Sequence, residues 1–179
     1  MKIVKALVAL SLVGVIAWWA RPTYGEPGLA VGQAAPDFSL QGSDGKTYTL
    51  SQFKGKKAVV IAWFPKAFTS GCTAECKSMR DSAEAIGSFD VAYFAASVDD
   101  AETNRKFAEN LSLPFPILSD PTKATGRAYK VVRLLPIASR WTYYIGKDGK
   151  VLEIDRDVKT ATAGEDLKKN LERLGIPKR

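Results

Sequence analysis

One short stretch limits what this chain can fold into more than any other, an unbroken apolar run from Ala58 to Phe64 that is followed by Pro65. The run, AVVIAWF, is rich in β-branched and aromatic residues and does not alternate between apolar and polar positions. These properties are typical of a central strand that is buried on both faces. Proline has no backbone N–H to offer a neighbouring strand, so it ends the run. We therefore expect a buried strand at the centre of a sheet.

The only two cysteines of the chain, Cys72 and Cys76, follow this strand closely. Thr69, Ser70 and Gly71 offer N-cap and turn chemistry, so the sequence predicts a helix that begins at or just before Cys72. The first amides of a helix have no backbone partner, and together with the helix dipole they favour a thiolate over a thiol. Cys72 is therefore the predicted nucleophile.

The spacing of the two cysteines places them on one face of an intact helix. Their Cβ atoms would lie about 5 to 6 Å apart, whereas a disulfide needs about 3.5 to 4.5 Å. Oxidation of the pair should therefore distort the first turn of the helix and give a strained, reducible bond. The alternative interpretation is that the cysteines are two small buried residues or one static disulfide.

The composition excludes several other kinds of active site. The chain has no histidine, so it can form neither a Ser-His-Asp triad nor a Cys-His pair. A four-ligand zinc site would need two carboxylates beside the two cysteines, which is uncommon. Direct thiolate chemistry remains, and it needs a fixed positive charge near the sulfur. Arg140, just before the predicted strand that begins at Trp141, is our candidate because a guanidinium does not deprotonate. The alternative interpretation is a surface arginine at the end of a strand.

Pro65, Thr69 and Cys72 match the P-x-x-x-T-x-x-C signature of peroxiredoxins. The surrounding WFPKAFTSGCTAE resembles the bacterioferritin-comigratory (Q-type) branch of the AhpC/TSA superfamily, and the likeness extends from about Val31 to the C-terminus. The resemblance implies that Cys72 is the peroxidatic cysteine and that Pro65 shields its thiolate. It also implies that Thr69 and Arg140 hydrogen-bond to the peroxide and polarise it.

A thiol-dependent peroxidase that reduces hydrogen peroxide or organic hydroperoxides is the function that this resemblance implies. Cys72 would become a sulfenic acid, Cys76 would condense with it to an intramolecular disulfide, and a thioredoxin-like donor would reduce the disulfide. Cys76 follows the nucleophile by four residues, whereas the Q-type branch usually places its resolving cysteine at five. No cofactor or metal is needed for this chemistry, and we expect a monomer or a weak dimer.

Two other classes of protein remain as alternative interpretations. A Sco-type copper-delivery module has the C-x-x-x-C spacing found here, but its metal site also needs a histidine. A thiol-disulfide oxidoreductase uses C-x-x-C and would place a cis-proline where this chain has Ser139 and Arg140.

Strands and helices alternate along the chain around the central strand. The other predicted strands are Lys46–Leu50, Val91–Val98, Phe115–Leu118, Trp141–Ile145 and Val151–Asp155. The predicted helices are Cys72–Gly87, a helix capped by Asp99 and Asp100 that runs to Leu111, Pro121–Tyr129, and Ala161–Leu174. This order indicates an α/β fold, a thioredoxin-like three-layer sandwich with a central mixed β-sheet flanked by helices.

Residues 1–25 have the composition of a targeting segment. Two lysines precede an uncharged apolar run, Ala6 to Ala20, which suits a secretory signal peptide and falls short of the roughly 20 residues that cross a bilayer. We expect a signal peptide or an N-terminal membrane anchor, then a tether over residues 26–34 and a peroxiredoxin domain over residues 35–179. In either case the predicted location is extracytoplasmic, in the periplasm or cell envelope.

The basic residues do not indicate nucleic-acid binding. The net charge is +7, but three basic residues, Lys2, Lys5 and Arg21, lie in the targeting segment. The remaining basic residues are interleaved with acidic ones and form no tract with stacking aromatic side chains, so a solvated surface explains them.

Overall fold

The fold was analysed in a computed structural model that describes residues 29–179; the predicted targeting segment, residues 1–25, and the first residues of the predicted tether lie outside this part. The strands are β1 (Ser39–Gly42), β2 (Thr47–Thr49), β3 (Ala58–Trp63), β4 (Val91–Ser97), β5 (Ile117–Ser119), β6 (Trp141–Ile145) and β7 (Val151–Asp155). The helices are the 3-10 helix η1 (Ser51–Phe53) and the α-helices α1 (Ser70–Asp81), α2 (Ala83–Gly87), α3 (Ala101–Leu111), α4 (Ala124–Ala128) and α5 (Ala163–Arg173).

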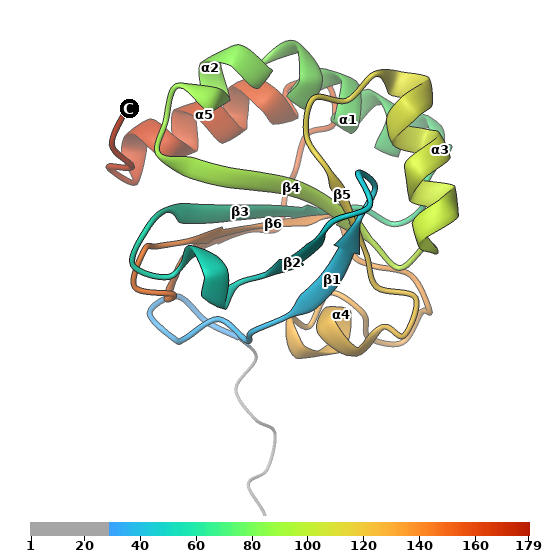
Figure 1. The fold of residues 1–179 in the computed structure, drawn as a ribbon, viewed down its shortest axis with the longest axis horizontal. Coiled ribbons are helices and arrows are strands. Elements are labelled where there is room, and N and C mark those ends of the chain that lie inside the picture. The colour runs from blue at the N-terminus through green and yellow to red at the C-terminus, as the bar shows by residue number, and fades with distance from the viewer. Residues whose placement is uncertain (1–28) are drawn as a thin grey trace, which may run out of the picture.

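The seven strands form one mixed sheet in the order β2-β1-β5-β4-β3-β6-β7. Helices α1, α2, α3 and α5 lie on one side of the sheet, and α4 lies on the other (Figure 1). This three-layer arrangement with a central mixed sheet confirms the predicted thioredoxin-like α/β fold. Among residues 29–179, no helix combines the length and the apolar character needed to cross a membrane.

β3 is an interior strand next to β4, the middle strand of the sheet, and all six of its residues are buried. It runs parallel to β4 and antiparallel to β6, with Trp63 opposite both Ala96 and Trp141. The C-terminal ends of β3 and β4 and the start of β6 therefore lie side by side at one end of the strands. This register brings three loops together there, and those loops carry the predicted active-site residues.

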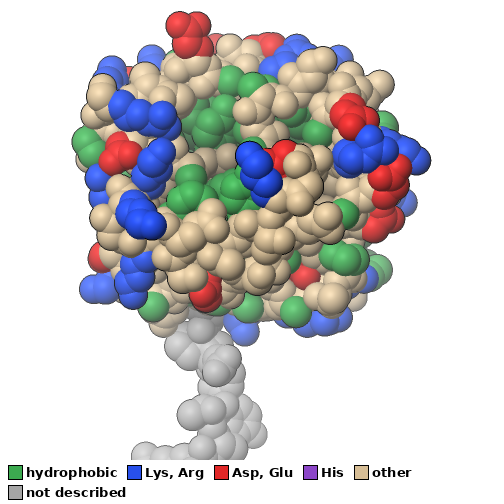
Figure 2. All heavy atoms as spheres, viewed as in Figure 1, with side chains coloured by type: hydrophobic (Ala, Val, Ile, Leu, Met, Phe, Trp, Pro, Cys, Tyr) green, Lys and Arg blue, Asp and Glu red, His purple; other side chains and the backbone are tan. Residues whose placement is uncertain are grey.

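Figure 2 shows acidic and basic side chains beside one another at the right of the molecule, along α3. Arg105, for example, forms ion pairs with Glu102 at 2.8 Å and with Glu109 at 2.6 Å. These pairs are solvent-exposed and lie one helical turn apart, so each contributes little to stability. These ion pairs explain some of the charged residues in the sequence, so those residues need no binding partner.

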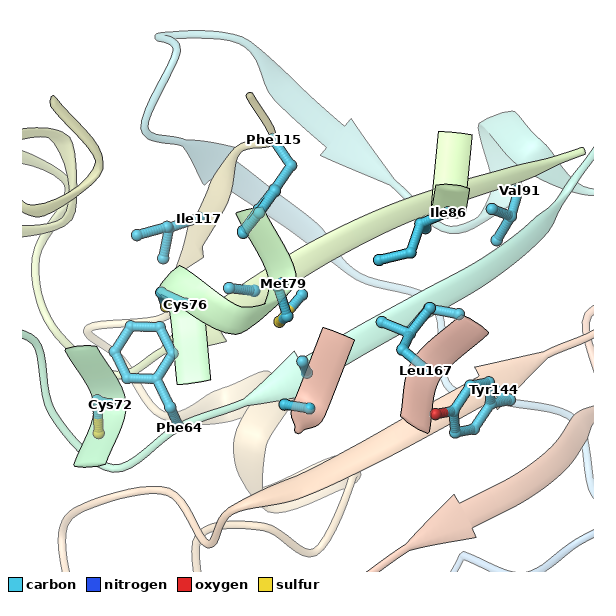
Figure 3. Close-up of a cluster of buried hydrophobic side chains, with 14 of the residues drawn as sticks. Phe64, Cys72, Cys76, Met79, Ile86, Val91, Phe115, Ile117, Tyr144 and Leu167 are labelled. Carbon is cyan, nitrogen blue, oxygen red and sulfur yellow. The ribbon is translucent and has the colours of Figure 1, made fainter. Parts of the chain in front are cut away.

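Two hydrophobic clusters fill the space on either side of the sheet. On the side of α1 and α5, a cluster that we call the helix-side cluster includes both cysteines together with Phe64, Met79 and Leu167 (Figure 3). On the opposite side the second cluster includes Leu29, Trp63, Tyr129 and Val131. Successive β3 residues alternate between the two clusters, because side chains along a strand point to opposite faces.

The predicted helix over residues 72–87 is wrong as one continuous element. α1 and α2 are separate helices, and Ser82 between them has φ −98° and ψ 6°, outside helical geometry. α5 packs closely at this point, since a Cβ added to Gly164 would lie 2.1 Å from the carbonyl oxygen of Ser78. The Gly164 amide also donates to the Ser78 hydroxyl oxygen at 3.0 Å.

Residues 29–34, the end of the predicted tether, pack against the domain. Leu29 is buried, and the Gly32 amide donates to the carbonyl of Val151 at 2.8 Å. Ala34 forms an isolated bridge with Lys150. The chain is therefore fixed to the sheet from Leu29 onward.

Candidate active site

The loop between β3 and α1, residues 64–69, which we call the active-site loop, is held in a strained conformation. Phe68 has φ +63°, a left-handed conformation that is unfavourable for a residue with a Cβ. The backbone amide of Ala67 donates to Asp99 Oδ2 at 2.8 Å, although the two residues are far apart in sequence. Asp99 follows β4, so the turn between β4 and α3 fixes the loop that precedes the helix.

Buried polar groups orient Asp99 in turn. The Ser97 hydroxyl lies 3.0 Å from Asp99 Oδ2 and 3.1 Å from Asn104 Oδ1, and the Asn104 amide donates to the Ser119 hydroxyl at 2.9 Å. Ser97, Asn104 and Ser119 are buried. A satisfied buried network of this kind is rigid, because losing any member leaves an unpaired polar group.

The start of α1 lies close to where the sequence predicts it. Thr69 occupies the N-cap position, but its hydroxyl makes no capping bond and donates to the carbonyl of Lys66 at 3.0 Å. The helix closes its first turn with a bond from the Thr73 amide to the Thr69 carbonyl at 2.9 Å. The amides of Ser70, Gly71 and Cys72 therefore have no partner within the helix. Cys72 lies at these donors, as predicted.

Arg140 lies against the Cys72 sulfur. Its Nη2 donates to Sγ at 3.4 Å, and it reaches this position from the residue just before β6. Gly71 makes room for the guanidinium, because a Cβ there would lie 3.2 Å from Nη2. The sequence gives Gly71 only a role in the turn, so this second role is found only in the structure.

Glu75 is a residue of the candidate site that our sequence analysis did not select. Its Oε2 accepts a hydrogen bond from Arg140 Nη1, and its side chain is only 1% exposed. Burial raises the pKa of Glu75 to about 7, although the charge and hydrogen bond of Arg140 lower it. Its position three residues after the nucleophile, on the same helical face, is the one sequence signal for this role.

Arg140 therefore bridges the Glu75 carboxyl group and the Cys72 sulfur. Burial acts to lower the pKa of Arg140, but Glu75 and Cys72 outweigh that effect, and the pKa is raised. The guanidinium remains a permanent cation in a largely enclosed site.

Cys76 lies one turn after Cys72, and both are free thiols that are fully buried. Burial raises the pKa of Cys76, and the charges of Glu75 and Cys72 raise it further. Cys76 is therefore a neutral thiol that belongs to the hydrophobic cluster under α1. Pro65 is partly exposed at the beginning of the active-site loop. The structure thus brings Cys72 and Arg140 together, while the hydroxyl of Thr69 is engaged with Lys66.

Comparison with known proteins identifies the family to which the chain belongs and its fold. The model of the AhpC/TSA family matches residues 31–154, a range that includes both cysteines, Glu75 and Arg140. The chain belongs to the AhpC/TSA family.

Relatives within this AhpC/TSA family carry peroxiredoxin names. Peroxiredoxin Bcp of Bacillus subtilis is 36% identical over 138 residues, which cover 73% of this chain and 87% of that protein. The chloroplastic peroxiredoxin Q of Populus jackii is 38% identical over 122 residues, which cover 67% of this chain and 57% of that protein. These names confirm the resemblance to the bacterioferritin-comigratory branch.

Solved structures of family members have the same fold. The peroxidoxin BcpB of Mycobacterium tuberculosis superposes with a TM-score of 0.74 at 27% identity, covering 81% of this chain and 97% of that one. A mutant of PrxQ from Xylella fastidiosa superposes with a TM-score of 0.77 at 19% identity, covering 84% and 99%, and supports the fold alone. Neither the Sco-type nor the oxidoreductase interpretation is favoured by these findings.

Proposed function

We propose that the protein is a thiol-dependent peroxidase in which Cys72 attacks a peroxide and Arg140 stabilises the charges that form. The observation that carries this proposal is the 3.4 Å contact between Arg140 Nη2 and the Cys72 sulfur at the free amides of α1. Membership of the AhpC/TSA family supports the same function.

In the first step the Cys72 sulfur bonds to one oxygen of the peroxide, and the O–O bond breaks. The departing oxygen leaves with the bonding electrons and takes up a proton, which gives water from hydrogen peroxide or an alcohol from an organic hydroperoxide. Arg140 and the free amides of Gly71 and Cys72 can donate hydrogen bonds to that oxygen as its negative charge develops. Cys72 is left as a sulfenic acid. Thr69 can join these donors only if its hydroxyl leaves Lys66.

In the second step the Cys76 thiol attacks the Cys72 sulfenic acid, which gives a disulfide and releases water. Cys76 is buried in the helix-side cluster, and its spacing in α1 is too wide for a disulfide. The first turn of α1 must therefore open before this bond forms. A thioredoxin-like donor then supplies the two electrons that return both thiols.

We further propose that the protein works outside the cytoplasm as a monomer or weak dimer. The support is the apolar run from Ala6 to Ala20, which is typical of a signal peptide or an N-terminal membrane tether. In this proposal residues 1–25 direct export or anchoring, residues 26–34 join them to the domain, and residues 35–179 carry the activity.

The mechanism is tested by adding one equivalent of hydrogen peroxide to the reduced protein, followed by a free-thiol count and an intact mass. We expect the loss of both thiols and no added oxygen in the wild type. The variant Cys72→Ser should keep its thiol, and Cys76→Ser should gain one oxygen. Retention of both thiols in the wild type while peroxide disappears would rule out the mechanism. The intact mass also reports whether the N-terminal segment has been removed.

A further inference from the structure

Exposed large apolar side chains in the described part of the chain are few and are gathered mainly in one loop. Between α4 and β6, Leu134 is 96% exposed, Leu135 65% and Ile137 39%. We call residues 133–138 the apolar loop. Phe68, in the active-site loop, is 55% exposed as well. Solvated surfaces rarely gather such side chains without a partner.

The chain around the apolar loop is strongly basic. Residues 121–140 contain five basic residues and no acidic one. Arg133 begins the apolar loop itself. Arg140, two residues after the loop, is held by Glu75 and Cys72, so it is not one of the cations that a lipid phosphate would meet. Apolar side chains within a basic segment are typical of protein surfaces that insert into a membrane interface, where the cations meet lipid phosphates. An acidic protein surface would complement the basic charges, but it would not explain why three apolar side chains are exposed beside them.

The N-terminal segment approaches the domain from the same side of the sheet. Leu29, where the described chain begins, shares its hydrophobic cluster with Tyr129 and Val131 just before the apolar loop. The Tyr129 hydroxyl also donates to the carbonyl of Pro36 at 2.8 Å. In Figure 1, the blue start of the described chain and α4 both lie below the sheet.

The length of chain before Leu29 limits how far this side can be from a bilayer. The apolar run ends at Ala20 and the fixed part begins at Leu29. A stretch of this length spans at most about 30 Å when fully extended. An N-terminal segment held in a membrane therefore keeps the apolar loop within reach of the lipid surface.

We propose that the apolar loop inserts into the surface of a lipid bilayer and so presents the Cys72 site to hydroperoxides held in that bilayer. This inference rests on the proposed peroxidase function and adds the surface on which that function works. The loop leads directly to Arg140, which contacts the reactive sulfur. A hydroperoxide group on an acyl chain is polar and costly to keep in hydrocarbon, so it moves toward the headgroups, where this site would meet it.

The reaction with such a substrate follows the same balance of atoms and electrons. The Cys72 sulfur takes the terminal oxygen of the lipid hydroperoxide and becomes a sulfenic acid. The O–O bond breaks, and the lipid oxygen takes up a proton and leaves as a lipid alcohol within the bilayer. The two electrons come from the sulfur, as they do with hydrogen peroxide.

The double variant Leu134→Ser/Leu135→Ser tests the proposal in the full chain. Both side chains are exposed, so the change should leave the fold intact. Two substrates are compared: hydrogen peroxide in solution, and phosphatidylcholine hydroperoxide in vesicles of phosphatidylcholine and phosphatidylglycerol. We expect the rate constant for the vesicle substrate to fall by about tenfold or more and that for hydrogen peroxide to change less than about twofold. A control, Lys168→Ser/Lys169→Ser on α5 across the sheet, should keep both rates.

Other outcomes overturn the proposal. An unchanged rate with the vesicle substrate would show that the apolar loop does not contact the lipid, and an equal loss with both substrates would show a defect in the site itself. If sedimentation finds a wild-type dimer and a monomeric variant with an unchanged vesicle rate, a second copy of the chain covers the loop instead. A wild type that consumes no hydrogen peroxide refutes the proposed function, whereas one that consumes hydrogen peroxide but not the vesicle substrate refutes only this inference.

Discussion

Replacing Arg140 by methionine should make the stability of the protein depend on pH in a way that Glu75 alone determines. Glu75 is almost fully buried, and its pKa is raised from an ordinary 4.5 to about 7 while Arg140 pairs with it. Because the folded-state pKa is the higher one, the protonated carboxyl favours folding. The protonated carboxyl makes its full contribution to the free energy of unfolding below pH 4.5, and this contribution is lost as the pH rises through about 7.

Without Arg140, both effects that lower the pKa of Glu75 disappear, and burial raises it further. At pH 5 the carboxyl is largely protonated in the folded wild type and in the variant, so the two differ only by the contacts that methionine cannot make. At pH 8, one unit above the wild-type value, the wild type has gained an ionised pair and the variant still holds a proton. One pKa unit corresponds to about 1.4 kcal/mol, so the loss in unfolding free energy should be about 1.4 kcal/mol larger at pH 8 than at pH 5.

Urea unfolding of the reduced protein at the two pH values measures this difference. Glu75→Gln provides the control background, because the amide has a similar shape and does not titrate. In that background, with Cys72→Ser in every protein compared so that no thiol beside Arg140 can titrate, Arg140→Met should cost the same at pH 5 and pH 8. The reasoning is refuted if Arg140→Met costs the same at both pH values in the wild-type background, or if the extra cost at pH 8 persists in the Glu75→Gln background, where the carboxyl is replaced by a neutral amide.

Two further predictions concern the supports of the site. Asp99→Ala removes the acceptor of the Ala67 amide. The second-order rate constant with hydrogen peroxide, measured by stopped flow, should therefore fall by roughly tenfold, whereas Asp99→Asn keeps an acceptor oxygen and should retain most of the rate. Equal rates for the two variants would contradict this role of Asp99. Gly164→Ala places a Cβ 2.1 Å from the Ser78 carbonyl oxygen and should lower the unfolding free energy in urea by about 1 to 3 kcal/mol. Gly87→Ala, where an added Cβ meets nothing within 4 Å, is its control and should not lower stability.

The parts of the fold that local patterns determine could be predicted from the sequence. The continuous apolar run predicts β3, and the limits of β6 and β7 match the predicted Trp141–Ile145 and Val151–Asp155. β1 was not predicted, because its four residues contain a single apolar side chain and its pairing with β5 joins distant parts of the chain. The single predicted helix over residues 72–87 fails at Ser82, where packing against α5 matters more than helical periodicity.

The features of the candidate site that are local in sequence could likewise be predicted, and those that depend on long-range contacts could not. The helix start at Cys72 is a local feature that the sequence predicts from neighbouring residues. The contact between Arg140 and Cys72 joins residues 68 positions apart, and the resemblance to peroxiredoxins was needed to select that arginine. The role of Glu75 depends on its burial beside Arg140, and the hydroxyl of Thr69 is directed by the carbonyl of Lys66. Both depend on tertiary structure, which spacing along the chain does not reveal.

The burial of Cys76 in the helix-side cluster links turnover to local unfolding. In the proposed mechanism each catalytic cycle detaches this thiol from its apolar neighbours, so substitutions that strengthen the packing beneath α1 would slow disulfide formation. The sulfenic acid would then persist and meet a second peroxide molecule, which converts it irreversibly to a sulfinic acid. Greater thermostability in this helix would therefore make the protein more easily inactivated by its own substrate.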